Sequence, residues 1–233
     1  MRRTLLFLLS LGALSLWAAD DFGIDYELDL QKKLNKKIDL GIEVTLATED
    51  GGSDFDRIKF TPYVGYDFFS WLEGQLAFRW TVDEKERTKK SDYWRDLWQL
   101  RADLTPSASL GNFTFSWRVR SVWENRGWLG LPSDLKVGGE IQESFELRNR
   151  LKISWRSPLK SLSLYLSSEV YTAWDNDEVE TSPRVSCWNS SAGFKQKWSK
   201  RTSTDLSLSS EREWEDGVKR QEITLTIGQR LNF

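Results

Sequence analysis

The chain has 233 residues and a formal net charge of -2, so it carries no basic excess of the kind that binds nucleic acid. It contains one cysteine and no histidine, which excludes an intrachain disulfide and metal sites built on Cys or His. Mean hydropathy is -0.54, yet aromatic residues make up 13% and include 13 Trp. This combination fits a membrane β-barrel, whose polar interior lowers the mean hydropathy and whose interfacial belts are rich in Trp.

Residues 1–19 predict a secretory signal peptide. Arg2 and Arg3 precede an apolar run from Leu5 to Leu16, and small residues follow at 18 and 19. The run is shorter than the roughly 18 apolar residues that a membrane-spanning helix needs. Residues 20–233 are therefore expected to form one exported domain.

From Phe22 onward, apolar and polar residues alternate in segments that polar turns separate. A period of two residues is the signature of a strand with one apolar and one polar face. Clear runs cover 24–30, 38–46, 58–68, 72–82 and 145–155, and further runs lie near 93–104, 113–123, 162–174, 185–196 and 202–212.

The last run, 218–233, predicts an insertion signal. Its apolar positions alternate up to a terminal aromatic residue, and three of its residues form the pattern: Gly228, Leu231 and Phe233. A strand that ends in this way resembles the C-terminal signal by which bacterial outer-membrane barrels are recognised for insertion. The expected partners are therefore outer-membrane lipid and the barrel assembly machinery.

The connections between runs alternate between short and long. Short ones lie at 32–37, 69–71, 105–112, 156–160 and 198–201, and longer, charged ones lie at 49–56, 83–91, 124–144 and 175–183. Short turns at one end and long loops at the other are typical of outer-membrane barrels. The sequence predicts an all-β fold: a transmembrane, antiparallel, up-and-down β-barrel of 10–12 strands in the bacterial outer membrane. The alternative is a soluble, lipocalin-like barrel with the same alternation turned inside out.

The count of runs is eleven, which conflicts with the even number expected of a bacterial barrel. If the 32–37 turn lies in the periplasm, the 22–30 strand starts outside the cell. Either that strand is not part of the wall, or a further strand lies within 124–144.

Several stretches resemble a family of exported bacterial proteins that is known as a domain of unknown function. The resemblance rests on the turn Leu34-Asn-Lys-Lys37, on Asp54-Phe-Asp-Arg57 before Tyr63-Val-Gly-Tyr66, and on Arg148-Asn-Arg-Leu-Lys-Ile153. Members of that family are predicted outer-membrane barrels. The resemblance implies a fold and a location, and it transfers no catalytic residues.

The chain is not expected to be an enzyme. Barrel lipases, acyltransferases and proteases depend on an imidazole that titrates near neutral pH, and this chain has none. Acids on one strand face, such as Asp25, Glu27 and Asp29, are interpreted as a solvated or ion-paired wall rather than a catalytic pair. No cofactor, metal or nucleic acid is expected.

The charges on the polar faces separate into two groups. The acidic arc comes from the first and last strands, which become neighbours when a barrel closes: Asp25, Glu27, Asp29, Asp39, Glu43, Asp205, Glu211 and Glu222. The basic arc comes from the middle strands: Arg95, Arg101, Arg118, Arg120, Arg148, Arg150 and Lys152.

We expect the two arcs to face each other across the lumen. If water separates them, the barrel is a narrow, porin-like channel for small polar or anionic solutes. If they pair across the lumen, it is a plugged structural barrel. A third hypothesis is an adhesin-like barrel that binds through its extracellular loops.

Overall fold

The computed structural model describes residues 21–49, 54–85, 93–129, 142–159, 161–175, 184–215 and 218–233. Eleven strands account for most of these residues: β1 (Asp21–Lys33), β2 (Ile38–Glu49), β3 (Asp54–Phe69), β4 (Leu72–Lys85), β5 (Tyr93–Leu110), β6 (Phe113–Leu129), β7 (Gln142–Arg156), β8 (Leu162–Asp175), β9 (Arg184–Lys197), β10 (Thr202–Glu215) and β11 (Val218–Asn232). The predicted signal peptide and most of the predicted long loops lie outside the described residues. The described part of the chain contains no helix long and apolar enough to cross a membrane.

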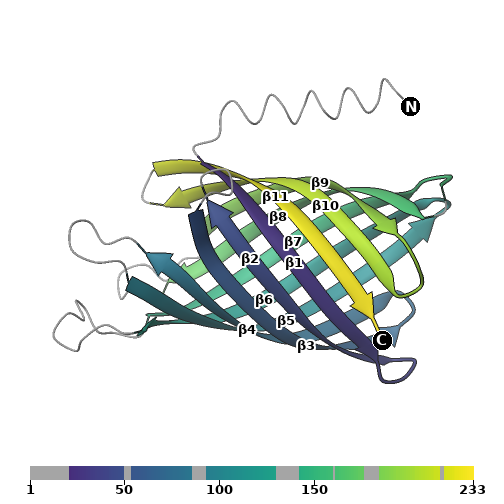
Figure 1. Ribbon diagram of the computed structural model, residues 1–233, viewed down its shortest axis with the longest axis horizontal. Helices are drawn as coiled ribbons and strands as arrows, with labels where there is room; N and C mark the ends of the chain where they lie inside the picture. Colours follow the sequence, from purple (N-terminus) through teal and green to yellow (C-terminus); the bar gives the residue numbers. More distant parts are fainter. Residues whose placement is uncertain are drawn as a thin grey trace.

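The strands close into one barrel, in which each pairs with its neighbours in the sequence and β1 meets β11 (Figure 1). The all-β barrel prediction is confirmed, and the strand count falls inside the predicted range. All pairs are antiparallel except the closing one, where β1 and β11 run parallel from Asp21↔Glu222 to Gln31↔Asn232. This parallel pair resolves the conflict over parity, because an odd number of alternating strands closes only if its first and last strands run the same way.

The 22–30 strand therefore belongs to the wall, as part of β1, and not outside it. Within the described residues no further strand lies between β6 and β7. The chain begins β1 at one end of the barrel and ends at the other, where Phe233 lies beside the short turns (Figure 1). We call the end where β1 begins the loop end, and the end with the short turns, where Phe233 lies, the turn end.

The two faces of the wall differ sharply in polarity. Outward side chains are large and apolar, and many are exposed, such as Leu76 (57%), Leu151 (63%) and Leu166 (55%). Inward side chains include charged groups that are almost fully buried, such as Arg101 (3%) and Asp103 (7%). A lipocalin-like barrel would have the opposite arrangement, so the soluble alternative is wrong. The fold is a β-barrel of the outer-membrane type, with a polar lumen and an apolar exterior.

Candidate functional site in the barrel lumen

The acidic arc lies on four consecutive strands of the wall. The closure of β11 on β1 makes β10, β11, β1 and β2 neighbours. The register sets the acids beside other inward positions, as in Asp25↔Thr226, Asp205↔Gly228 and Glu211↔Glu222. The arc therefore consists of Asp25, Glu27 and Asp29 on β1, Asp39 and Glu43 on β2, Asp205 and Glu211 on β10, and Glu222 on β11.

The basic arc lies on the opposite wall. In the closing order, β6 and β7 are the strands farthest from β1, and β5 adjoins β6. The register pairs Arg118 with Arg150 and Arg120 with Arg148, which concentrates guanidinium groups on two adjacent strands. The members whose side chains are described are Arg101, Arg118, Arg120, Arg148, Arg150 and Lys152, whereas the side chain of Arg95 lies outside the described residues.

Carboxylates that the sequence reasoning left out are interspersed with this basic arc. Arg120 donates two hydrogen bonds to Asp103, at 2.7 and 2.6 Å. Arg118 forms a 2.6 Å ion pair with Glu169 of β8, and Arg148 pairs with Glu146 of its own strand. Asp103 and Glu146 share the polar face of their strands with arginines, so the same alternation that identified the arginines carried the signal for these two acids.

The acidic arc is likewise interspersed with cations. Lys59 of β3 lies 3.7 Å from Asp25, Arg79 of β4 lies 3.0 Å from Glu43, and Arg230 of β11 lies 2.7 Å from Asp29. Every ion pair seen among the described residues joins groups of one strand or of strands at most two places apart. The pairs therefore run along the wall and do not bridge the two arcs.

Some donors of the basic arc remain available. Among the residues that the structure describes, the Nε atoms of Arg118 and Arg150 have no hydrogen-bond partner. Arg101 directs both Nε and Nη2 to one amide oxygen, that of Gln99, at 2.9 and 2.5 Å. Unsatisfied buried donors are costly and rare, so these groups favour an anion or water in the lumen beside them.

Two tyrosines lie flat against the wall, each over a glycine of the next strand. Tyr63 of β3 is paired with Gly41 of β2, and its hydroxyl reaches past β2 to donate to Asp29 of β1 at 2.9 Å. Tyr165 of β8 is paired with Gly193 of β9 and donates in the same way to Asp205 of β10 at 2.6 Å. A Cβ at either glycine would collide with the tyrosine ring. Glycine within a strand often marks such a close approach, and the sequence reasoning did not use that signal.

This contact gives a test of wall packing. Gly41→Ala is expected to lower the free energy of unfolding by about 1–3 kcal/mol, because the new methyl group displaces Tyr63 from Asp29. Gly228→Ala is the matched control, since its Cβ would find no atom closer than 3.5 Å. Urea unfolding of the barrel in lipid vesicles measures both, and equal losses in the two variants would contradict the packing role of Tyr63.

The residues of the predicted insertion signal occupy the turn end. Gly228 faces the lumen beside Asp205 and Glu27. Phe233 is 71% exposed, and its backbone N–H donates to the carbonyl of Gln31 at 2.9 Å, which ties the last residue to β1. Recognition of these residues by an assembly machinery stays a prediction.

The geometry thus defines a class of protein, a closed β-barrel of the outer-membrane type whose lumen is lined by ion-paired charges. The chain belongs to the family "Protein of unknown function (DUF2490)", whose model matches residues 22–222. The resemblance to an uncharacterised barrel family is thereby confirmed. A solved structure with a similar chain is the outer-membrane expressed OmpT of Vibrio cholerae, with 12% identity and a TM-score of 0.41. The match covers 83% of this chain and 64% of that one. No curated protein sequence matches the chain.

Proposed function

We propose that this protein resides in the bacterial outer membrane as a narrow, porin-like channel for small polar or anionic solutes. The observation that carries the proposal is the direction of the lumen side chains. Tyr63 and Tyr165 lie along the wall, and the ion pairs connect near neighbours on it. Side chains held in this way line a passage, whereas a plug would require contacts between opposite walls.

The basic arc favours anions within such a passage. Arg118 and Arg120 have side chains that are 12% and 14% exposed, so they keep a small accessible surface although both are ion-paired. A ring or wall of guanidinium groups lowers the barrier for anions and raises it for cations. Because the chain has no histidine, the proposal includes no catalytic step. Its partners are outer-membrane lipid, the assembly machinery and the transported solutes.

A plugged, non-conducting barrel, structural or binding through its extracellular loops, is the second candidate. Its support is the tight middle of the barrel, where Arg101, Gln99 and Glu169 are 3%, 6% and 8% exposed. Side chains this deeply buried leave little room for solvent around them.

Neutralising four arginines separates the two candidates. If the lumen conducts, replacing Arg118, Arg120, Arg148 and Arg150 with Gln is expected to shift selectivity toward cations, with the K⁺/Cl⁻ permeability ratio rising at least about threefold. Conductance persists in that case. If the barrel is plugged, the same change leaves acids such as Asp103 and Glu169 unpaired and lowers thermal stability, with no conductance before or after.

Single-channel recording in planar bilayers measures conductance and reversal potential. The matched control replaces four exposed cations at the turn end: Lys32, Lys36, Lys37 and Arg156. This control removes the same charge outside the middle of the lumen, so a smaller change in the K⁺/Cl⁻ permeability ratio is expected. A wild-type barrel that inserts into the bilayer but never conducts would contradict the channel proposal.

A further inference from the structure

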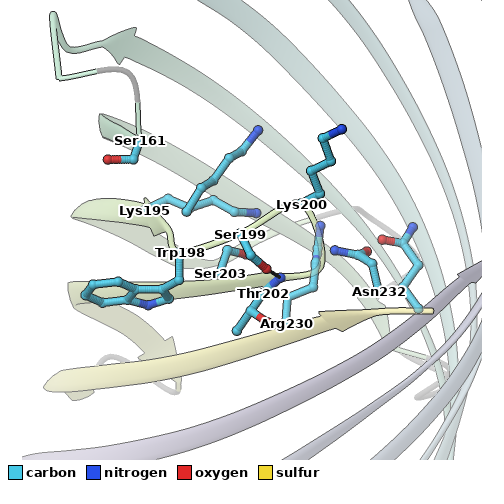
Figure 2. Close-up of a pocket in the computed structure, with 11 residues that line it drawn as sticks. Ser161, Lys195, Trp198, Ser199, Lys200, Thr202, Ser203, Arg230 and Asn232 are labelled. Atoms are coloured by element: carbon cyan, nitrogen blue, oxygen red, sulfur yellow. Dashed lines mark hydrogen bonds between the residues drawn. The ribbon is translucent and has the colours of Figure 1, made fainter.

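A pocket of about 580 Å³ opens at the turn end of the barrel (Figure 2). Most of its lining residues belong to β9, β10, β11 and the turn between β9 and β10. Four of its lining side chains are cations: Lys195, Lys197, Lys200 and Arg230. None of the described residues that line it is acidic. The pocket lies outside the basic arc of the middle strands and has no role in the channel proposal.

Its positive charge is largely uncompensated. Arg230 is neutralised by Asp29 at 2.7 Å. Lys195 is paired in the register with Asp205, which accepts the hydroxyl of Tyr165 at 2.6 Å and offsets part of the charge of Lys195 without forming an ion pair with it. Within the described part of the chain, no carboxylate lies within ion-pair distance of Lys195, Lys197 or Lys200. Three ammonium groups around one pocket repel one another unless an anion lies between them.

The turn between β9 and β10 also supplies a hydroxyl donor. The Oγ atom of Ser199 accepts the backbone N–H groups of Arg201 and Thr202, both at 3.0 Å. Since the oxygen already accepts two bonds, the hydroxyl proton of Ser199 is available to a ligand. Two backbone bonds, from Trp198 N and Ser199 N to Thr202 O at 3.0 and 3.2 Å, hold the turn in shape.

We propose that this pocket binds a phosphate-type oxyanion that carries at least two negative charges. Ammonium groups bind phosphate as point charges, and hydroxyl donors complete its hydrogen bonds. Three lysines that form no ion pair among the described residues match a doubly charged phosphate monoester better than a singly charged anion. The binding does not depend on whether the lumen conducts.

Two sources offer this chemistry: a phosphorylated solute at the mouth of the lumen, or an anionic phospholipid headgroup at the membrane surface. Lys195 and Arg230 lie on lumen-facing positions, which favours the solute. Trp198 is 68% exposed, and its ring lies on the opposite side of the lining residues from Asn232 (Figure 2). An exposed indole at a barrel rim suits the interface with lipid, so the test includes both sources.

The test is calorimetric titration of inorganic phosphate into the purified barrel in zwitterionic detergent at pH 8, compared with chloride at equal ionic strength. The expected result is saturable binding of phosphate only. Replacing Lys195, Lys197 and Lys200 with Gln is expected to raise the Kd about tenfold or more. The matched control replaces Lys32, Lys36 and Lys37, three cations at the end of β1 and in the β1–β2 turn, at the same end of the barrel, and is expected to change the Kd less than about threefold.

The same titration in phosphatidylcholine nanodiscs, with and without phosphatidic acid, separates the sources. If phosphatidic acid raises the apparent Kd for phosphate, the pocket takes a lipid headgroup. If it has no effect, the pocket takes a soluble phosphate from the aqueous phase, and either result supports a phosphate site. The proposal is overturned if the wild-type barrel binds no phosphate above chloride, or if the control triple variant loses as much affinity as the pocket variant.

Discussion

Asp103→Asn is expected to lower the free energy of unfolding by about 3 kcal/mol. The side chain of Asp103 is 6% exposed and that of Arg120 is 14% exposed, so the pair is largely shielded from water. The substitution keeps the shape of the residue but removes the charge that Arg120 binds through two nitrogen atoms. An uncompensated guanidinium then remains inside the barrel beside Arg118 and Arg148, whose charges have the same sign.

The matched control is Asp29→Asn at the closing seam. Asp29 also binds an arginine, but the side chain of Arg230 is 43% exposed and regains water when its partner is lost. A loss of only about 1 kcal/mol is expected there. Urea titration in lipid vesicles, followed by tryptophan fluorescence, compares the two. Equal losses, or no loss at Asp103, would show that water reaches the middle of the lumen as freely as it reaches the rim.

The alternation of the sequence was sufficient to predict the strands and, where it is regular, the two faces of each strand. It works because a residue placed on the wrong face is costly, with charge turned to lipid or apolar surface turned to a polar lumen. The regular alternation around Arg148 and Arg150 is an example, and the register places both beside arginines of β6.

The ion pairs of the lumen could be predicted only in part. Alternation shows that Asp103 and Glu146 share a face with neighbouring arginines, so the mixed composition of the basic arc was available from the sequence. The partner of Arg118 was not, because Glu169 lies two strands away and meets it only through the registers of β6 with β7 and of β7 with β8. Registers depend on the lengths of turns and on packing across several strands.

The direction of β1 relative to β11 was also beyond the reach of alternation. A strand has the same period when read in either direction, and only the count of strands distinguishes the two closures. The parallel pair extends over eleven residues of each strand, and Arg230 and Asp29 join it from the lumen side. Parallel pairing is slightly weaker per residue than antiparallel pairing, which gives such side-chain links more weight at the seam.

For a barrel in the outer membrane, as proposed above, the parallel seam predicts that the start of β1 and the end of β11 lie on opposite sides of the membrane. Single cysteines test this when they are introduced into a Cys187→Ser background, which removes the one native thiol. Asp21→Cys marks the start of β1, Glu49→Cys marks the loop end, and Ser70→Cys marks the turn end. A membrane-impermeant maleimide is expected to label positions 21 and 49 from the same side and position 70 from the other.

The expected difference is nearly all-or-none when the charged maleimide is coupled to a polymer too large for the proposed lumen, because such a reagent does not cross an intact outer membrane. Labelling of intact cells, compared with labelling after permeabilisation, gives the side for each position. The pair at 49 and 70 is an internal control, since only β3 lies between them in either closure and a single crossing separates a loop from a turn. If position 21 is labelled together with position 70, the first strand enters from the turn end. The wall would then hold an even number of strands, and the acidic residues of β1 would lose their register beside Thr226, Gly228 and Arg230.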